Sequence, residues 1–139
     1  MIAALSPTDT KIAGFGFRRG VTLASLRRLL ASTDQAQDLS ALATAADKAL
    51  TPAFQDLARS LGVPVIAVSL ADICEQEEAV AGPHVPARYG HKSLSEAAAL
   101  AACGANAALI LRRTASADGL ATIAIAQIHA GYSLRIEDL

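Results

Sequence analysis

The stretch that decides the fold is AGFGFRRGVT, which runs from Ala13 to Thr22. It joins a predicted strand, Lys11 to Phe17, to a predicted helix for which Thr22 is a suitable N-cap. Apolar residues at spacings of three and four indicate that helix, namely Leu23, Leu26 and Leu30. A glycine-rich connection between a strand and a helix can cradle an anion, or it can simply turn the chain. The choice between these two roles decides the functional interpretation.

The remaining sequence alternates between helical and extended patterns. The first predicted helix after the opening stretch runs from Thr51-Pro52 to Leu61, with Phe54, Leu57, Ala58 and Leu61 on its apolar face. A strand from Val65 to Ser69, a short acidic helix around Ala71 to Glu78 and a loop from Ala81 to Lys92 follow. The last predicted elements are a helix from Ser93 to Gly104 and strands from Ala107 to Leu111 and from Leu120 to Ile128. Leu39 to Ala45 is an apolar run too short to be assigned to either class. Ser93-Leu94-Ser95-Glu96 has the form of a capping box.

These elements predict a single α/β domain over residues 1–139. The turn TASADG is so short that the last two strands must be antiparallel. Both strands are apolar on both faces, so we expect them inside a covered sheet. The predicted architecture is a three-layer α/β/α sandwich around a mixed, mostly parallel sheet that carries an antiparallel C-terminal hairpin.

The composition excludes several classes of protein. The chain has 139 residues, of which 53% are hydrophobic and 18% charged, which fits one compact domain with a sizeable core. The net charge of -1 argues against generic nucleic-acid binding, which needs a broad basic field. No apolar run approaches the roughly 20 residues of a membrane span, and the N-terminus lacks a secretory pattern. We therefore expect a cytoplasmic protein without nucleic-acid or membrane partners.

Metal, disulfide and dinucleotide sites also find little support. Cys74 and Cys103 lie far apart and suggest buried thiols rather than a disulfide. The three histidines, His84, His91 and His129, lack the close pairing of a zinc site, so we expect no metal and no cofactor. The glycines of the opening stretch are one residue off the dinucleotide fingerprint, and no acidic residue follows a second strand to hold a ribose. What favours an anion site is Arg18-Arg19, because guanidinium groups beside a helix N-terminus suit carboxylate or phosphate.

Four segments in order resemble a known family. They are GFGFRRGV, the lone Lys48 before a helix, Val85 to Gly90 leading into SLSEAAALAACG, and TASADGLATIAIA. From about Lys11 to Ala126 the chain is similar to the CobE family, which is also the C-terminal domain of the cobalt-precorrin hydrolase CbiG in vitamin B12 biosynthesis. The resemblance implies an α/β/α domain that acts on or holds corrin-ring intermediates, which are macrocycles fringed with carboxylate arms.

The resemblance also implies site residues. Those that match the family pattern are the paired glycines Gly14 and Gly16, the basic pair Arg18 and Arg19, Lys48, the run Gly90, Ser93 and Glu96, and Thr122 at the opening of the last strand. Three positions depart from the pattern. Phe17 stands where the family has a cysteine, Thr51 where it has a glutamate, and Leu94 where it has a valine. A thiol role is thereby excluded, and any chemistry that needs that carboxylate is absent.

Each matching residue also has a purely structural explanation. Ser93 and Glu96 can cap their helix and do nothing more, Lys48 can be a solvated surface residue, and Thr122 can be a strand residue. In the functional interpretation, the connections before three helices lie on one rim of the sheet. That rim would carry a set of basic groups suited to a polycarboxylate: Arg18, Arg19, Lys48, Arg88, His91 and Lys92. Arg112-Arg113 is either a solvated turn or a further basic wall.

Two functions remain open. One is a non-catalytic module that binds corrin intermediates and hands them to other cobalamin-pathway enzymes. The other is a small hydrolase that opens a lactone and releases acetaldehyde, as the resemblance to CbiG implies. The sequence favours the module, because no nucleophile, base and acid can be assembled from it and the catalytic residues stay unknown. A phosphate-binding domain unrelated to corrins is a third and weaker interpretation.

Overall fold

The computed structural model describes residues 10–76, 79 and 93–128. Its elements, in chain order, are β1 (Thr10–Phe17), α1 (Leu23–Ala31), β2 (Ala41–Ala45), α2 (Pro52–Leu61), β3 (Val65–Val68), α3 (Leu70–Cys74), α4 (Leu94–Cys103), β4 (Ala108–Ala115) and β5 (Ala121–Ile128). The predicted helices and strands are therefore present, and the ambiguous run Leu39 to Ala45 contains strand β2. The predicted loop from Ala81 to Lys92 lies outside the described residues.

The strands form one sheet in the order β3-β2-β1-β5-β4. β1, β2 and β3 pair in parallel, whereas β5 is antiparallel to both β1 and β4. Of the strands in this sheet, β5 alone therefore runs opposite to the others. The sheet is mixed and mostly parallel, with an antiparallel hairpin at its C-terminal end, as the sequence predicts.

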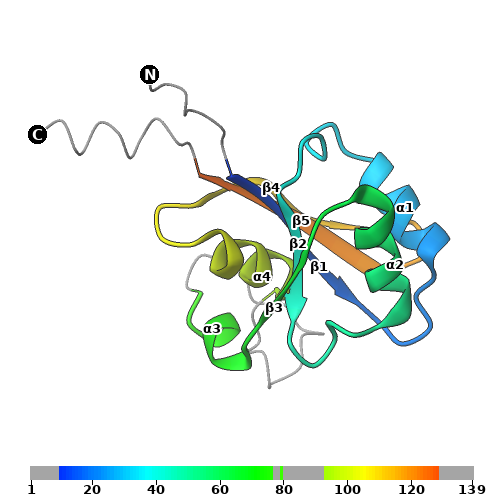
Figure 1. Ribbon diagram of the computed structural model, residues 1–139, viewed down its shortest axis with the longest axis horizontal. Coiled ribbons are helices and arrows are strands. Elements are labelled where there is room, and N and C mark those ends of the chain that lie inside the picture. Colours follow the sequence, from blue (N-terminus) through cyan, green and yellow to red (C-terminus); the bar gives the residue numbers. More distant parts are fainter. Residues whose placement is uncertain (1–9, 77–78, 80–92, 129–139) are drawn as a thin grey trace, which may run out of the picture.

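Helices cover both faces of the sheet, as Figure 1 shows: α1 and α2 lie on one side and α3 and α4 on the other. On the first side the aromatic rings of Phe15 and Phe17 pack against Phe54 of α2, with centroid distances of 5.6 Å and 5.4 Å. On the other side the small residues of α4, including Ala97 and Ala98, are completely buried. The three-layer α/β/α prediction is confirmed.

Strand β1 alternates between these two layers. Ala13, Phe15 and Phe17 belong to the core under α1 and α2, while Gly14 and Gly16 face α4. A Cβ atom added at Gly14 would lie 2.6 Å from the backbone nitrogen of Ala99. Glycine is therefore needed at this position because a helix backbone crosses the strand at close range.

Four local expectations are wrong. β4 is the edge strand, and most of its side chains are partly or fully exposed rather than covered. Leu61 is 40% exposed, so it is not buried with Phe54, Leu57 and Ala58 of α2. Thr51 occupies the N-cap of α2, yet its side chain makes no capping hydrogen bond. Cys74 is exposed rather than buried. Burial in the last turn of a helix and at a sheet edge depends on neighbours that periodicity does not reveal.

Candidate functional site

The carboxyl ends of β1, β2 and β3 lie at one edge of the sheet because these strands are parallel. The connections that leave the first two strands at this edge lead directly into α1 and α2. The start of α4 reaches the same edge, because Leu94 is the helix residue nearest to Gly16 of β1. We call this region the carboxyl edge. In open α/β sheets, binding groups collect at such an edge.

Arg18 and Arg19 extend from the carboxyl edge into solvent. Both residues are exposed. The backbone N–H of Arg18 donates to the carbonyl of Leu120 at 2.9 Å, and the Val21 N–H donates to the Arg18 carbonyl at 3.1 Å. Gly20 completes the turn with a φ of +91°, a conformation that favours glycine. The backbone of this connection is thus held while both guanidinium groups stay accessible.

Lys48 comes from the next connection and lies beside the end of β1. Its Nζ is 5.5 Å from the centroid of the Phe17 ring, in a cation–π arrangement. The backbone around it is a tight turn: the Lys48 N–H donates to the carbonyl of Ala45 at 2.9 Å, and the Thr51 N–H donates to the carbonyl of Lys48 at 3.1 Å. The fold therefore brings Lys48 next to Phe17, which directly precedes Arg18 in the chain.

Gly14 and Gly16 do not form the anion-binding loop that the sequence suggested. Both lie within β1, and neither has a positive φ. A Cβ atom at Gly16 would lie 3.0 Å from Oγ1 of Thr122 and 3.4 Å from Cβ of Leu94. The physical reason for both glycines is close packing of β1 under α4. Thr122 pairs with Gly16 across the sheet, so it lies at the same end of the strands as Arg18.

Ser93 and Glu96 are both buried at the start of α4. The Oγ of Ser93 accepts a hydrogen bond of 3.5 Å from the Glu96 N–H, so the serine half of the capping box is present. Glu96 is 1% exposed, and its Oε2 accepts a hydrogen bond of 2.9 Å from the Arg113 N–H. The guanidinium of Arg112 lies 3.9 Å from the same oxygen. The Glu96 carboxylate therefore ties α4 to strand β4.

The remaining predicted site residues lie outside the described part of the chain. They are Gly90 and His91, together with Arg88 and Lys92 of the proposed basic rim and the histidines His84 and His129. Among residues 10–76, 79 and 93–128, no group of three metal-ligating side chains comes together. No helix in that same part is long and apolar enough to cross a membrane. Of the predicted rim, Arg18, Arg19 and Lys48 can thus be placed, and they come from two neighbouring connections.

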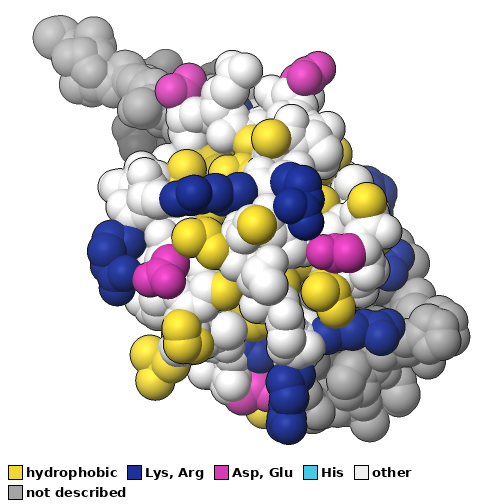
Figure 2. Space-filling model, turned by 90° about the vertical axis from the view of Figure 1, so that its right-hand side faces the viewer, with side chains coloured by type: hydrophobic (Ala, Val, Ile, Leu, Met, Phe, Trp, Pro, Cys, Tyr) yellow, Lys and Arg dark blue, Asp and Glu magenta, His cyan; other side chains and the backbone are white. Residues whose placement is uncertain are grey.

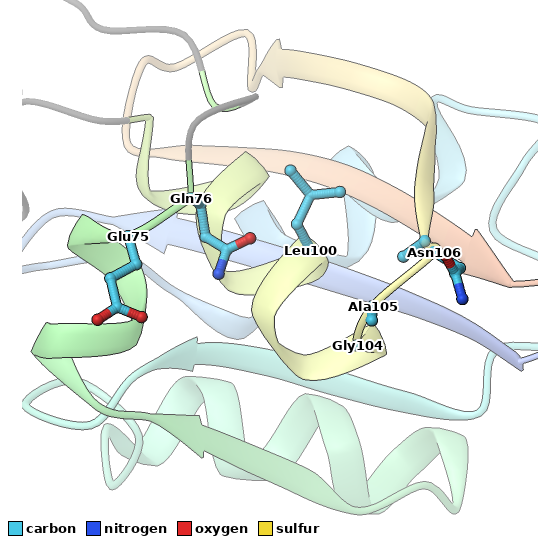
Figure 3. Close-up of a pocket in the computed structure, with 7 residues that line it drawn as sticks. Glu75, Gln76, Leu100, Gly104, Ala105 and Asn106 are labelled. Carbon is cyan, nitrogen blue, oxygen red and sulfur yellow. The ribbon is translucent and has the colours of Figure 1, made fainter.

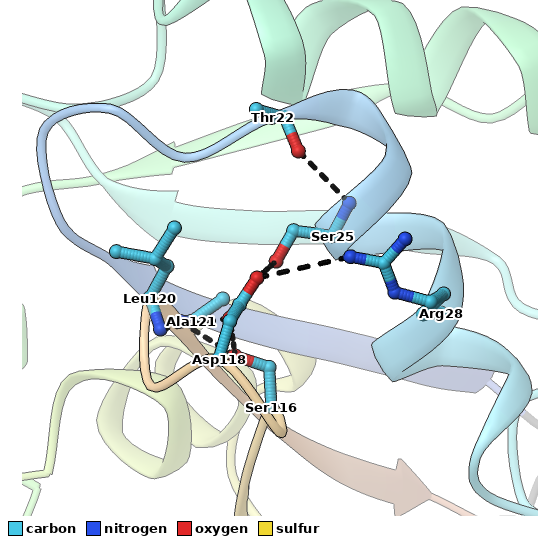
Figure 4. A network of polar contacts seen from close by, with 7 residues as sticks. All are labelled: Thr22, Ser25, Arg28, Ser116, Asp118, Leu120 and Ala121. Atoms are coloured by element: carbon cyan, nitrogen blue, oxygen red, sulfur yellow. Dashed lines mark hydrogen bonds and ion pairs between the residues drawn. The ribbon is translucent and has the colours of Figure 1, made fainter.

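A polar network that the sequence did not predict joins the β4–β5 turn to α1 (Figure 4). Asp118 accepts hydrogen bonds from the Ser25 hydroxyl at 2.5 Å, the Ser116 hydroxyl at 2.6 Å and the Leu120 N–H at 3.0 Å. These bonds, from Ser116 first, lower the pKa of Asp118 to about 2. The Asp-Gly dipeptide marked this turn, but nothing in the sequence showed that its carboxylate reaches Ser25.

The surface over α1 and α2 carries charges of both signs. Figure 2 shows basic, acidic and hydrophobic side chains interspersed on that side of the molecule. Arg59 pairs with Asp56 at 2.7 Å, and Arg28 lies 3.9 Å from Asp118. Two of the arginines on this side therefore already lie close to a carboxylate.

A cavity of about 300 Å³ lies at the C-terminal end of α4 (Figure 3). Its lining consists of Glu75, Gln76, Leu100, Gly104, Ala105, Asn106 and Ala107. None of these is a predicted site residue, and the lining contains one carboxylate and no basic side chain. The cavity is therefore unsuited to a carboxylate ligand.

Fold and site together define an α/β/α domain with exposed basic groups at the carboxyl ends of its parallel strands. Residues 11–126 match the family described as Cobalamin synthesis G C-terminus, and the chain belongs to this family. The resemblance drawn from the sequence motifs is thereby confirmed. A comparison with curated proteins finds no match.

Solved structures agree with this family. The chain is 31% identical to CobE, a protein from the cobalamin (vitamin B12) biosynthetic pathway, over 89% of this chain and 97% of that one, with a TM-score of 0.74. It is 30% identical to the cobalamin biosynthesis protein chiG from Agrobacterium tumefaciens, over 84% and 97% of the two chains, with a TM-score of 0.61. A "putative cobalamin biosynthesis protein G homolog" from Sulfolobus solfataricus shares the fold over 85% of this chain and 36% of that one, at 21% identity and a TM-score of 0.63. The protein is a member of the cobalamin biosynthesis pathway.

Proposed function

We propose that this protein binds a corrin-ring intermediate of cobalamin biosynthesis at the carboxyl edge and carries it between pathway enzymes. The observation that supports this proposal is that Arg18, Arg19 and Lys48 lie on two neighbouring connections, with Lys48 Nζ 5.5 Å from the ring of Phe17, the residue before Arg18. Both arginines are exposed and Lys48 is half-buried, so all three can reach a ligand. Several cations at one edge of the sheet suit a molecule that carries several carboxylates.

The chemistry of the two residue types matches such a ligand. A guanidinium can hold a carboxylate through two parallel hydrogen bonds, and an ammonium pairs with one as a point charge. The Nζ of Lys48 lies near the Phe17 ring, which keeps the charge close to the strand end. Thr122 is partly exposed near the start of β5, which lies at the carboxyl edge because Thr122 pairs with Gly16, and it adds a hydroxyl there. Cations on two connections can pair with separate arms of one macrocycle.

The hydrolase alternative rests on membership of the synthesis protein G family. The groups at the carboxyl edge do not favour it. Ser93 is 2% exposed, and the partners of its hydroxyl among the described residues are the Ser95 hydroxyl at 3.4 Å and the Glu96 N–H at 3.5 Å, neither of which is a general base. Thr51 has a hydroxyl where the family pattern has a carboxylate, and a hydroxyl is not a base near neutral pH. A carrier needs neither group.

The test is a spectral titration with cobyrinic acid, a corrin whose peripheral carboxylates are all free. Binding is expected to shift the corrin absorbance and to weaken steeply as salt is raised, because salt screens exposed charges beyond about 10 Å at 0.1 M. A ligand with the same ring and amidated arms should bind more weakly. Failure of cobyrinic acid to bind at low salt contradicts the proposal.

A further inference from the structure

Leu50 is the most exposed large hydrophobic residue in the described part of the chain. Its relative exposure is 84%, whereas the next such residue, Leu61, is 40% exposed. A single exposed leucine is ordinary on a protein surface and by itself indicates nothing. The location of Leu50 is what sets it apart, because it lies in the β2–α2 connection two residues after Lys48.

Leu50 lies in a hydrogen-bonded turn. Its neighbour Ala49 is 5% exposed, and the carbonyl of Ala49 accepts a hydrogen bond of 2.6 Å from the Gln55 side chain. The Thr51 N–H on the other side is bonded to the carbonyl of Lys48 at 3.1 Å. The backbone is thus hydrogen-bonded on both sides of Leu50, and the Leu50 side chain lies in solvent.

This apolar side chain therefore shares one short turn with a cation at the carboxyl edge. Lys48 Nζ lies 5.5 Å from the Phe17 ring centroid, and the exposed Arg18 directly follows Phe17. A ligand that is anionic throughout would gain nothing from Leu50. A ligand that combines a broad apolar surface with anionic arms would gain from both residues, because burial of a leucine side chain is favourable.

We infer that Leu50 contacts the apolar face of the bound macrocycle while Lys48 pairs with one of its carboxylate arms. The inference rests on the proposed function and makes Leu50 a specificity-determining residue of that site. Leu50 selects a ring that carries carboxylates over a simple polycarboxylate. Lys48 and the two arginines accept either kind of molecule.

The experiment compares two ligands across matched variants. Cobyrinic acid supplies ring and carboxylates, and butane-1,2,3,4-tetracarboxylate supplies carboxylates alone. We expect Leu50→Ser to weaken cobyrinic acid binding about tenfold, from partial loss of the transfer free energy of a leucine side chain. Binding of the tetracarboxylate and the salt dependence should not change. Leu61→Ser is the matched control, because Leu61 is an exposed leucine at the opposite end of α2, and it should bind both ligands as the parent does.

Three other results would contradict the inference on Leu50, and one of them would also contradict the proposed function. If the parent protein binds cobyrinic acid and Leu50→Ser binds it equally well, the inference on Leu50 is wrong and the proposed function stands. If Leu50→Ser weakens both ligands to the same extent, Leu50 supports the cationic groups rather than the ring, and the inference is again wrong. If the parent binds neither ligand, the proposed function fails and the inference fails with it. The thermal midpoint of Leu50→Ser should match that of the parent, since the side chain is 84% exposed.

Discussion

The backbone of α4 passes so close to Gly14 that a Cβ atom there would lie 2.6 Å from the amide nitrogen of Ala99. The obstacle is main chain rather than a side chain that could rotate away. Helix α4 must therefore shift before any other residue can occupy position 14, and this helix also carries Ser93 and Glu96 at the carboxyl edge.

We expect Gly14→Ala to destabilise the fold by about 3 kcal/mol, at the upper end for overpacking in a tight core. Gly20→Ala is the control, because a Cβ atom there meets nothing within 4 Å and only the φ of +91° is unfavourable. That strain costs about 1 kcal/mol. Urea unfolding of both variants measures the difference. If both variants lose the same free energy of unfolding, α4 can move away from β1 at little cost in free energy.

The two glycines of β1 also mark the limit of what the sequence could predict. The strand from Lys11 to Phe17 follows from its residues, and so does the cap at Thr22, whose Oγ1 accepts from the Ser25 N–H at 3.1 Å. The role of the glycines does not, because an anion loop and a close helix crossing both require the same small residue. Only the position of α4, which is distant in sequence, separates the two.

We expect Glu96→Ala to cost about 1–3 kcal/mol of stability, because it leaves the Arg113 N–H without its acceptor. Glu96→Gln keeps an acceptor oxygen and should cost less. Thermal unfolding of both variants measures the difference. If Glu96→Ala unfolds as the parent does but loses cobyrinic acid binding, the carboxylate serves the ligand and not the link between α4 and β4.

Asp118 should make stability depend on pH. Hydrogen bonds lower its pKa from 3.8 to about 2 in the folded protein. A depressed carboxyl pKa contributes stability that is present above the ordinary value and is lost as pH falls through the folded value. We therefore expect the free energy of unfolding of the parent to exceed that of Asp118→Asn at pH 5, and the difference to shrink between about pH 4 and 2. Denaturant unfolding at several pH values measures this, and a difference that does not vary with pH would contradict the assignment.

Arg18 should contribute to ligand affinity and not to folding. Its side chain is exposed, while its backbone is held by the Leu120 carbonyl in a way that Ala can maintain. We expect Arg18→Ala to weaken cobyrinic acid binding by about 1.5–3 kcal/mol, the range for a charge-assisted hydrogen bond, with an unchanged thermal midpoint. Arg59→Ala in the last turn of α2 is the control, since it removes an exposed arginine away from the carboxyl edge. Equal binding by Arg18→Ala and the parent would remove Arg18 from the site.

The candidate site was less predictable than the fold. Periodicity and capping depend on residues near one another in the chain, and they located the helices that matter at the carboxyl edge. Leu50 carried no signal, because it lies in a turn held by Gln55 and by the Lys48 carbonyl. The link from Glu96 to Arg113 likewise depends on β4 lying beside α4. Such contacts between distant segments are set by the packed sheet and not by local pattern.

A carrier and a hydrolase differ in whether the bound intermediate is turned over. A hydrolase must activate water or attack carbon, and the connection from Lys48 to Thr51 offers an ammonium and a hydroxyl, with no carboxylate at position 51. The hydroxyl is far from ionising near neutral pH and cannot act as a general base. We therefore expect a lactone-bearing cobalt-corrin intermediate to bind to the protein without release of acetaldehyde, as followed by an aldehyde assay.

Two variants make this test decisive. Lys48→Met should weaken binding of the intermediate, because it removes the cation beside Phe17. Lys11→Met is the control: its amine donates to the carbonyls of Gln35 and Gln37 at 3.2 Å and 2.8 Å, near the start of β1 and away from the carboxyl edge. Repeated turnover by the parent and by Lys11→Met that is abolished in Lys48→Met would overturn the carrier proposal. In that case Lys48 would be catalytic, and the hydrolase would be the function of this domain.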